Sequence, residues 1–242
     1  MDSREKSIRS LLVQLLISLK NFYTFKDLEQ LLGVSQYNLW KYTSLNMIPE
    51  EQTARRIYEK ITSSRIVEKI IIEQLEIAGE DNEWLYLWNP GLLDLVGFMS
   101  LKYFDKTSID TVVGFPEKSI TLGLAIAKWM RKKLCIACSH QVYRSSKYII
   151  ETYITSNHEP RLLYLPRNCI NKNSRVLAVT NMISDANEVK ALLNLIGKIP
   201  AKTIGLLAID STIDPEALKP RTPITIKILK HEINKSLAQK QH

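Results

Sequence analysis

The chain has 242 residues, of which 45% are hydrophobic and 24% are charged. This length suits one medium-sized domain plus a small one, and the composition excludes collagen-like, low-complexity and mostly disordered chains. No stretch approaches the roughly 18 consecutive apolar residues of a membrane span, and the apolar run at 11–19 is interrupted by Gln14 and Ser18. We expect a soluble cytoplasmic protein without a membrane partner.

The formal net charge of +8 is concentrated in one part of the chain. Residues 128–175 carry 10 Lys or Arg against 2 Asp or Glu, whereas residues 63–127 carry 5 against 10. A concentrated positive charge attracts polyanions and phosphorylated ligands, which an average charge does not. This basic block is a candidate phosphate-binding surface, and an ordinary solvated surface is the alternative.

The first eighty residues are predicted to form helices only, including a connecting helix at 66–77 that ends at Gly79. Apolar residues recur at three- and four-residue spacing over 8–19, as on one face of an amphipathic helix. A second helix is capped by Thr24, has Asp27 at its third position and ends at Gly33. Ser35 then caps a short helix whose exposed positions hold amides, phenols and a lysine, which can reach base edges and phosphates.

A helix, a short glycine-containing turn and a polar helix follow the helix-turn-helix plan. Residues 24–61, with Leu-Gly-Val-Ser at 32–35 and a helix that starts after Pro49, resemble the phage-repressor-type helix-turn-helix family. The resemblance implies that the helix capped by Ser35 reads double-stranded DNA, and a purely structural helical cap is the alternative. Because Lys41 is the single cation there, strong affinity needs a dimer or further contacts. The residues assigned to DNA binding are Ser35, Gln36, Tyr37, Asn38, Lys41 and Tyr42.

From residue 82 onward, short β-branched runs alternate with helical segments. Strands are predicted at 110–114, 134–137, 148–154, 161–165, 175–180 and 203–209, and helices at 120–130 and 185–197. Such alternation predicts βαβ units and a mostly parallel sheet, with a ligand site at the carboxyl ends of the strands. We therefore predict an α/β protein with a helix-turn-helix domain at 1–62, a helical linker at 63–81, an α/β domain at 82–230 and a polar tail, helical or frayed, at 231–242.

This second half resembles a type I phosphoribosyltransferase over residues 89–209. Residues 110–119 match the strand and loop that bind pyrophosphate in that family, and 175–188 match the signature strand and loop that hold phosphoribosyl pyrophosphate. Residues 143–147 stand in place of the family's flexible hood, where a plain solvated loop is the alternative to a ligand or DNA contact. The resemblance implies a Rossmann-like fold of the kind that commonly forms dimers.

The departures from the family fall on residues that its chemistry needs. Active members carry two adjacent acidic residues at the strand end, where this chain has Thr180 and Asn181, neither a good ligand for a hard cation. The family's Thr-Gly-Gly-Thr phosphate loop is replaced by Asp-Ala-Asn-Glu at 185–188, whose carboxylates repel a phosphate. We expect no catalytic residue and no cofactor. The residues of this degenerate pocket are Lys118, Ser119, Thr180, Asn181, Ser184, Asp185, Ala186, Asn187 and Glu188.

The cysteines give no strong signal. Cys135, Cys138 and Cys169 are too few for a disulfide framework, which fits a reducing compartment. Cys135 and Cys138 with His140 contain the residue types of a zinc site, but on a strand the two cysteines point to opposite faces. We therefore expect no metal.

A DNA-binding head joined to a ligand-binding fold is the layout of a one-component regulator. The pairing resembles archaeal transcription regulators related to orotate and purine phosphoribosyltransferases. It implies a nucleoid-associated homodimer that binds specific double-stranded DNA and whose second domain is an inactive enzyme fold. That domain is either a relic used for dimerisation or a sensor of a nucleotide or a ligand like phosphoribosyl pyrophosphate. A protein that coats DNA without sequence preference and an active phosphoribosyltransferase with an atypical site are the alternatives.

Overall fold

The computed structural model describes residues 8–79, 82–104, 109–142, 144, 147–218, 220 and 223–238. The chain divides into two compact units, Met1–Phe98 and Met99–His242. The finer domain boundaries at residues 62, 81 and 230 stay predictions. Parts of the predicted linker (80–81), hood (143 and 145–146) and tail (239–242) lie outside the described residues.

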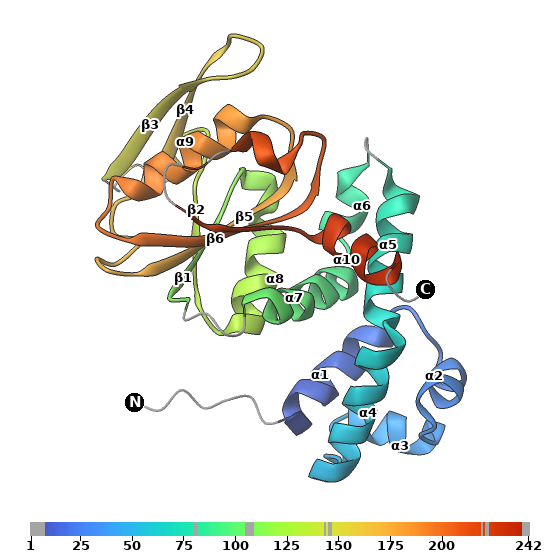
Figure 1. Ribbon diagram of the computed structural model, residues 1–242. Helices are drawn as coiled ribbons and strands as arrows, with labels where there is room; N and C mark the ends of the chain where they lie inside the picture. The colour runs from blue at the N-terminus through green and yellow to red at the C-terminus, as the bar shows by residue number, and fades with distance from the viewer. Residues whose placement is uncertain are drawn as a thin grey trace. The chain divides into compact units, whose positions relative to one another are not determined.

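The first unit is built from helices, as predicted, and Figure 1 shows them in blue to green. The stripe predicted on the first helix is buried, since Leu12, Leu15, Leu16 and Leu19 have no exposed surface. The first helix packs against the third and fourth helices. The second helix also packs against the third and fourth. The helices are α1 (Ile8–Leu19), α2 (Phe25–Leu32), α3 (Gln36–Thr43), α4 (Glu51–Ser64), α5 (Ile66–Ala78), α6 (Glu83–Leu87) and α7 (Pro90–Phe104), the last of which continues into the second unit.

The predicted caps of α2 and α3 are confirmed. The Thr24 hydroxyl accepts a hydrogen bond from the Asp27 backbone N–H at 3.2 Å, and the Thr24 backbone N–H donates to the Asp27 carboxylate at 2.8 Å. Gly33 ends α2 in the left-handed conformation with φ 66°, which costs glycine little because it has no Cβ. The Ser35 hydroxyl accepts from the Asn38 N–H at 3.4 Å. These caps fix the turn between the two helices.

The second unit contains a five-stranded parallel sheet of order β2-β1-β5-β6-β7. One face is covered by α9, whose Val189, Leu192 and Leu195 join the main core cluster. Helix α8 lies on the other face, where Gly123 meets the Leu134 side chain (Figure 1). The elements are β1 (Thr111–Gly114), α8 (Ile120–Met130), β2 (Lys133–Ile136), β5 (Arg175–Ile183), α9 (Ala186–Gly197), β6 (Lys202–Ser211), β7 (Thr225–Ile228) and α10 (Leu229–Ala238).

Two of the predicted strands do not belong to this sheet. β3 (Tyr148–Ile154) and β4 (Pro160–Pro166) form a separate antiparallel hairpin, so their assignment to the parallel sheet is wrong. Only residues 155–159 connect them, whereas a parallel crossover needs roughly a dozen residues or more. The inner face of the hairpin buries Leu163 and Leu165 in the core cluster, and β3 lies beside α9 (Figure 1).

Further elements and one disulfide were not predicted. α6, β7 and most of α7 carry no strong periodic signal. α10 begins at Leu229, two residues before the predicted polar tail, and runs to Ala238, so the described part of the tail has the helical form of the two that we expected. Cys135 is bonded to Cys169, so the expectation of reduced cysteines is wrong for this pair. The sequence could not show it because 34 residues separate the two cysteines. Cys138 is buried and free, and burial raises the pKa of its thiol to about 11.

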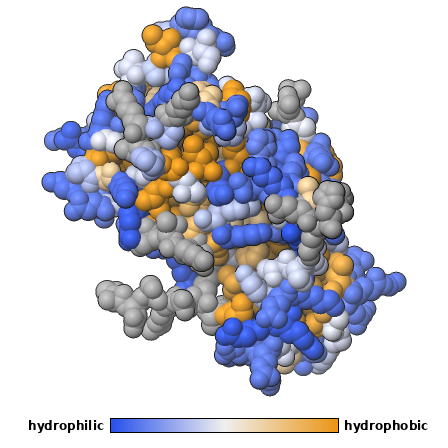
Figure 2. Space-filling model, viewed as in Figure 1, coloured by the Kyte–Doolittle hydropathy of each residue, from blue (hydrophilic) through white to orange (hydrophobic). Residues whose placement is uncertain are grey.

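None of the described helices is long and apolar enough to cross a membrane. Among the described residues, no group of three or more His, Cys, Asp or Glu side chains could hold a metal ion. Figure 2 shows apolar side chains reaching the surface between hydrophilic ones on both units.

Thr24→Ala removes the acceptor of the α2 capping box. We expect the local opening of α2 to become easier by about 1 kcal/mol, or about fivefold in the exchange of its amide hydrogens. Hydrogen-exchange mass spectrometry of residues 25–32 measures this change. Thr24→Ser keeps the hydroxyl and serves as the control, and equal exchange in both variants would contradict the role of the cap.

Candidate functional site

Five of the six predicted DNA-contacting residues lie at the surface of the first unit. Ser35, Gln36 and Tyr37 are exposed, and Asn38 and Lys41 are half-buried. Tyr42 is only 5% exposed, so its assignment to DNA contact is wrong. It lies three residues after the fully buried Leu39, on the face of α3 that turns toward the core.

Contacts between side chains hold the exposed face of α3. The Gln36 amide donates to the Glu29 carboxylate of α2 at 2.7 Å. The Lys41 ammonium lies 4.3 Å from the centre of the Tyr37 ring, and Tyr37 stacks on Trp40 at 6.3 Å. Trp40 is 47% exposed and was missed, although it lies three residues after Tyr37 and so on the same face. The face therefore combines aromatic rings and amides with one cation.

In the second unit, the end of β5 is closed to solvent. Thr180 is 4% exposed and Asn181 is fully buried. The Ser119 hydroxyl lies 2.7 Å from Asn181 Oδ1 and accepts from the Asn181 backbone N–H at 3.1 Å. The Thr180 hydroxyl donates to the Met182 carbonyl at 3.1 Å. Three of the predicted pocket residues thus use their polar groups inside the fold.

The loop from β5 to α9 is hydrogen-bonded to the turn of the hairpin. The Asp185 carboxylate caps α9 by accepting from the Asn187 N–H at 2.8 Å and also accepts from the Ser156 N–H at 2.8 Å. The Asn187 amide donates to the Ile154 carbonyl at 3.1 Å. Burial would raise the pKa of Asp185, but the two backbone N–H groups outweigh it and hold the pKa below its usual value. Ser184 is exposed and Ala186 half-buried.

Glu188 lies under the hairpin at the first turn of α9. It accepts a hydrogen bond from the Tyr153 hydroxyl at 3.2 Å. Burial raises the pKa of Glu188, and the charge of Asp185 raises it further, against the hydrogen bond from Tyr153 and the charge of Lys118. Burial and the neighbouring Glu188 likewise raise the pKa of Tyr153.

The loop after β1 carries another carboxylate, which sequence reasoning missed. Glu117 accepts from the backbone N–H of Ser139, from the Ser139 hydroxyl at 2.8 Å, and lies 3.3 Å from His140 Nδ1. Burial opposes the charge of Glu117, but these partners and a backbone hydrogen bond of its own hold its pKa below the usual value. Lys118 beside it is exposed. The spacing of residues in the sequence did not indicate this contact, because Glu117 and Ser139 lie on different loops.

The remaining contacts hold the hairpin along α9. The Lys198 ammonium pairs with the Glu151 carboxylate and donates to the Ile150 carbonyl, both at 2.5 Å. The Asn194 amide donates to Glu151 at 3.4 Å. Together with Asn187, Lys198 therefore satisfies carbonyls of β3 that would otherwise form an open sheet edge.

The carboxyl ends of the parallel strands are therefore acidic. Glu117 follows β1, and Asp185 and Glu188 follow β5, with Lys118 and His140 near them. Asp210, near the end of β6, is paired with Lys230 at 2.6 Å. In an α/β fold this edge is where helix amino termini favour anions. Here Asp185 caps α9 and binds the hairpin, Glu188 accepts from the hairpin's Tyr153, and Glu117 binds Ser139. These carboxylates repel a phosphate dianion. This arrangement offers hydrogen-bond acceptors and negative charge.

Solved structures with this fold are found by comparison. Adenine phosphoribosyltransferase from Saccharomyces cerevisiae matches with a TM-score of 0.55 and 18% identity, over 66% of this chain and 99% of that one. The adenine phosphoribosyltransferase from Trypanosoma brucei matches with a TM-score of 0.56 and 14% identity, over 67% and 78%. The enzyme from Rhodothermus marinus matches with a TM-score of 0.53 and 18% identity, over 66% and 98%.

No protein-family model and no curated protein sequence matches the chain. At these identities the structural matches show the fold alone. The chain therefore combines an N-terminal helical region with an α/β part that has the fold of type I phosphoribosyltransferases.

Glu188→Gln tests the electrostatics of the acidic edge. Because the folded state raises the pKa of Glu188 above its ordinary value of 4.5, the charged form costs stability above that pH and costs none well below it. We expect the substitution to raise the free energy of unfolding near pH 7 and to leave it almost unchanged near pH 4. Urea unfolding at both pH values measures the effect.

Glu216→Gln removes an exposed carboxylate elsewhere in the second unit and is the control for the loss of one negative charge. An equal effect of Glu188→Gln at both pH values would contradict this account of Glu188.

Proposed function

We propose that this protein is a sequence-specific DNA-binding transcription regulator whose α/β unit does not catalyse phosphoribosyl transfer. The observation that carries the proposal is the presentation of Gln36, Tyr37 and Asn38 on a capped helix held against another helix by a glycine turn. In helix-turn-helix proteins, residues at the amino end of the second helix contact base edges in the major groove.

The chemistry of α3 supports base contact more than general attraction to phosphates. Amides of Gln and Asn can form bidentate hydrogen bonds with adenine. Gln36 is already oriented by Glu29, and the Tyr37 and Trp40 rings add exposed apolar area at the same face. Lys41, the one cation of α3, lies over the Tyr37 ring. Affinity must therefore come in part from a dimer or from another surface.

The proposal that the unit does not catalyse phosphoribosyl transfer is supported by the polar groups at the end of β5, which bind other groups of the chain. A phosphoribosyltransferase of this type needs acidic groups free to organise ribose hydroxyls and magnesium pyrophosphate. Thr180 and Asn181 are buried and neutral, and Asp185 accepts backbone N–H groups of the chain itself. We propose that this unit sets the geometry of a homodimer. An effector at its acidic edge would carry amine or hydroxyl groups.

The DNA assignment is tested by substituting Gln36 and Asn38 together with alanine. Each good amide contact with a base contributes about 1–3 kcal/mol of discrimination, so the ratio of affinities for two DNA sequences should fall at least about 10-fold. The probes are duplex DNA from upstream of the protein's own coding region and a shuffled duplex of equal length. Fluorescence anisotropy gives both dissociation constants.

The matched control replaces Gln52 of α4 and Gln74 of α5 with alanine, because it removes two amides outside α2 and α3. It should keep the wild-type ratio. Unchanged discrimination in the Gln36 and Asn38 variant would remove α3 as the recognition helix.

The catalytic part of the proposal is tested with adenine, phosphoribosyl pyrophosphate and magnesium, because the solved structures of similar fold are adenine phosphoribosyltransferases. We expect no release of pyrophosphate above background under conditions in which the Saccharomyces cerevisiae enzyme turns over. Turnover that is lost in Glu188→Gln or Lys118→Gln would show an active enzyme with an atypical site.

A further inference from the structure

The basic block of the sequence is only partly a single surface in the structure. Arg161 pairs with Glu159 on the hairpin, while other cations of the block gather where the parallel strands begin. Lys133 starts β2 and Arg175 starts β5, and Lys202, from outside the block, starts β6. We call this surface the amino edge of the sheet, made of Arg131, Lys132, Lys133, Lys172, Arg175 and Lys202.

The strand register places these residues in a row. Lys133 is the partner of Thr111 in β1, Thr111 is the partner of Val176 in β5, and Arg175 is the partner of Lys202. Neighbouring strands lie about 4.8 Å apart, so the row from β2 to β6 spans roughly 14 Å. Duplex DNA rises about 3.4 Å per base pair along each strand, so the row covers about four phosphate steps.

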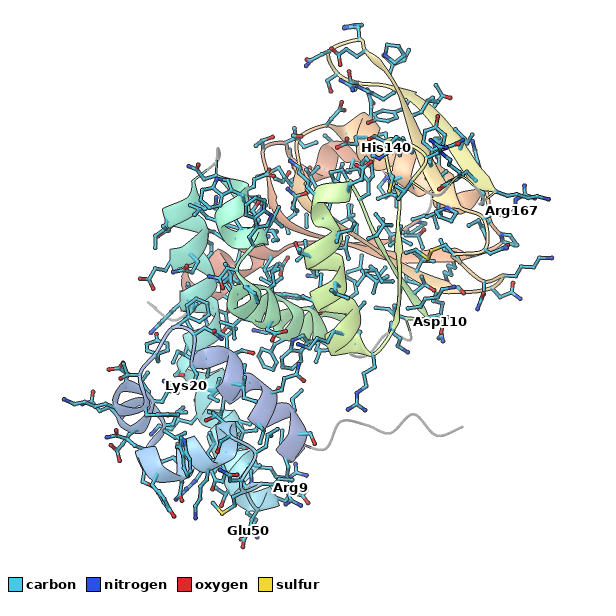
Figure 3. All side chains as sticks on the ribbon, turned by 180° about the vertical axis from the view of Figure 1, so that it is seen from behind. Arg9, Lys20, Glu50, Asp110, His140 and Arg167 are labelled. Carbon is cyan, nitrogen blue, oxygen red and sulfur yellow. A yellow bond between two sulfur atoms is a disulfide. The ribbon has the colours of Figure 1, made fainter. Side chains whose placement is uncertain are left out.

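All six side chains of the amino edge are exposed. Among the described residues that begin these strands or directly precede them, Asp110 is the one carboxylate, and Arg175 pairs with it at 3.2 Å. In the described part of the chain, Lys132, Lys172 and Lys202 make no ion pair. Figure 3 shows Asp110 and His140 at opposite ends of the sheet, so this edge is separate from the acidic one.

Stabilisation of helix ends explains only part of the row. Arg131 directly follows α8, where a cation interacts favourably with the carboxyl end of the helix. Lys172 and Lys202 lie in or after loops and end no helix. Of the large hydrophobic side chains that the structure describes as exposed, none is at 131–133, 172–175 or 202, whereas protein interfaces are enriched in aromatic residues and poor in lysine. The surface therefore fits a polyanion.

We infer that the amino edge contacts the phosphate backbone of double-stranded DNA. This inference rests on the proposed function, which makes DNA the polyanion that the chain already holds. It assigns to the second unit the phosphate contacts that α3, with Lys41 alone, does not supply. Such contacts add affinity without sequence preference.

The test neutralises three cations in the full chain with Lys132→Gln, Lys172→Gln and Lys202→Gln. The matched control, with Lys69→Gln, Lys190→Gln and Lys235→Gln, makes the same change of net charge elsewhere. Affinities for the upstream and shuffled duplexes are measured between about 50 and 200 mM salt. Circular dichroism and thermal melting verify that both variants fold.

The slope of log affinity against log salt should fall by about 0.9 for each DNA phosphate that the variant no longer neutralises. Over this fourfold range of salt, each phosphate contact accounts for about a 3.5-fold loss of affinity. If the three lysines neutralise three phosphates, wild type and control should therefore lose about 40-fold more affinity than the edge variant. Both duplexes should be affected by the same factor. Equal slopes in the edge variant and the control would overturn the inference.

The other outcomes separate this inference from the proposed function. A reduced slope in the edge variant, with no discrimination between the two duplexes by wild type, would support the DNA contact of the amino edge and would refute sequence-specific binding. No binding of wild type to either duplex would refute both. Tighter binding of single-stranded RNA than of duplex DNA, weakened by the edge substitutions, would overturn the assignment to DNA.

Discussion

The fully buried contact between the Ser119 hydroxyl and the Asn181 side chain joins the end of β5 to the turn before α8. Because both groups are neutral and hydrogen-bonded, the strand end can close without the cost of a buried charge. The loops around it then turn to the protein itself, since Asp185 binds the hairpin and Glu117 binds Ser139. The Thr180–Asn181 part of β5 is thus in the packed interior, and the loops beside it bind other parts of the chain.

The two edges of the sheet carry opposite charges. The carboxyl edge, where an enzyme of this fold would bind phosphate, is acidic, and the amino edge is basic. Glu117, Asp185 and Glu188 place carboxylates at the carboxyl edge, where Asp185 caps α9, and cations begin the strands at the amino edge. Helix amino termini attract anions, and in this chain that attraction is satisfied by Asp185 from within.

Local signals could be predicted from the sequence, and pairings between distant segments could not. The capping box at Thr24 and the helices at α8 and α9 depend on neighbouring residues, and they were predicted well. The hairpin was assigned to the wrong sheet because β propensity does not name the partner strand. Tyr42 was taken as exposed because its phenol suits DNA, although its position after Leu39 turns it inward. The contact of Glu117 with Ser139 joins separate loops, so no spacing in the chain revealed it.

The central claim is that DNA binds at the amino edge and that pyrophosphate does not bind at the carboxyl edge. The most direct test is to follow the backbone amides of the second unit by nuclear magnetic resonance as the two anions are added separately. Duplex DNA should shift the amides of residues 131–133, 172–175 and 202, whereas magnesium pyrophosphate should leave 115–119 and 184–188 unchanged. Shifts in 115–119 and 184–188 on addition of pyrophosphate, with none at the amino edge on addition of DNA, would contradict the account.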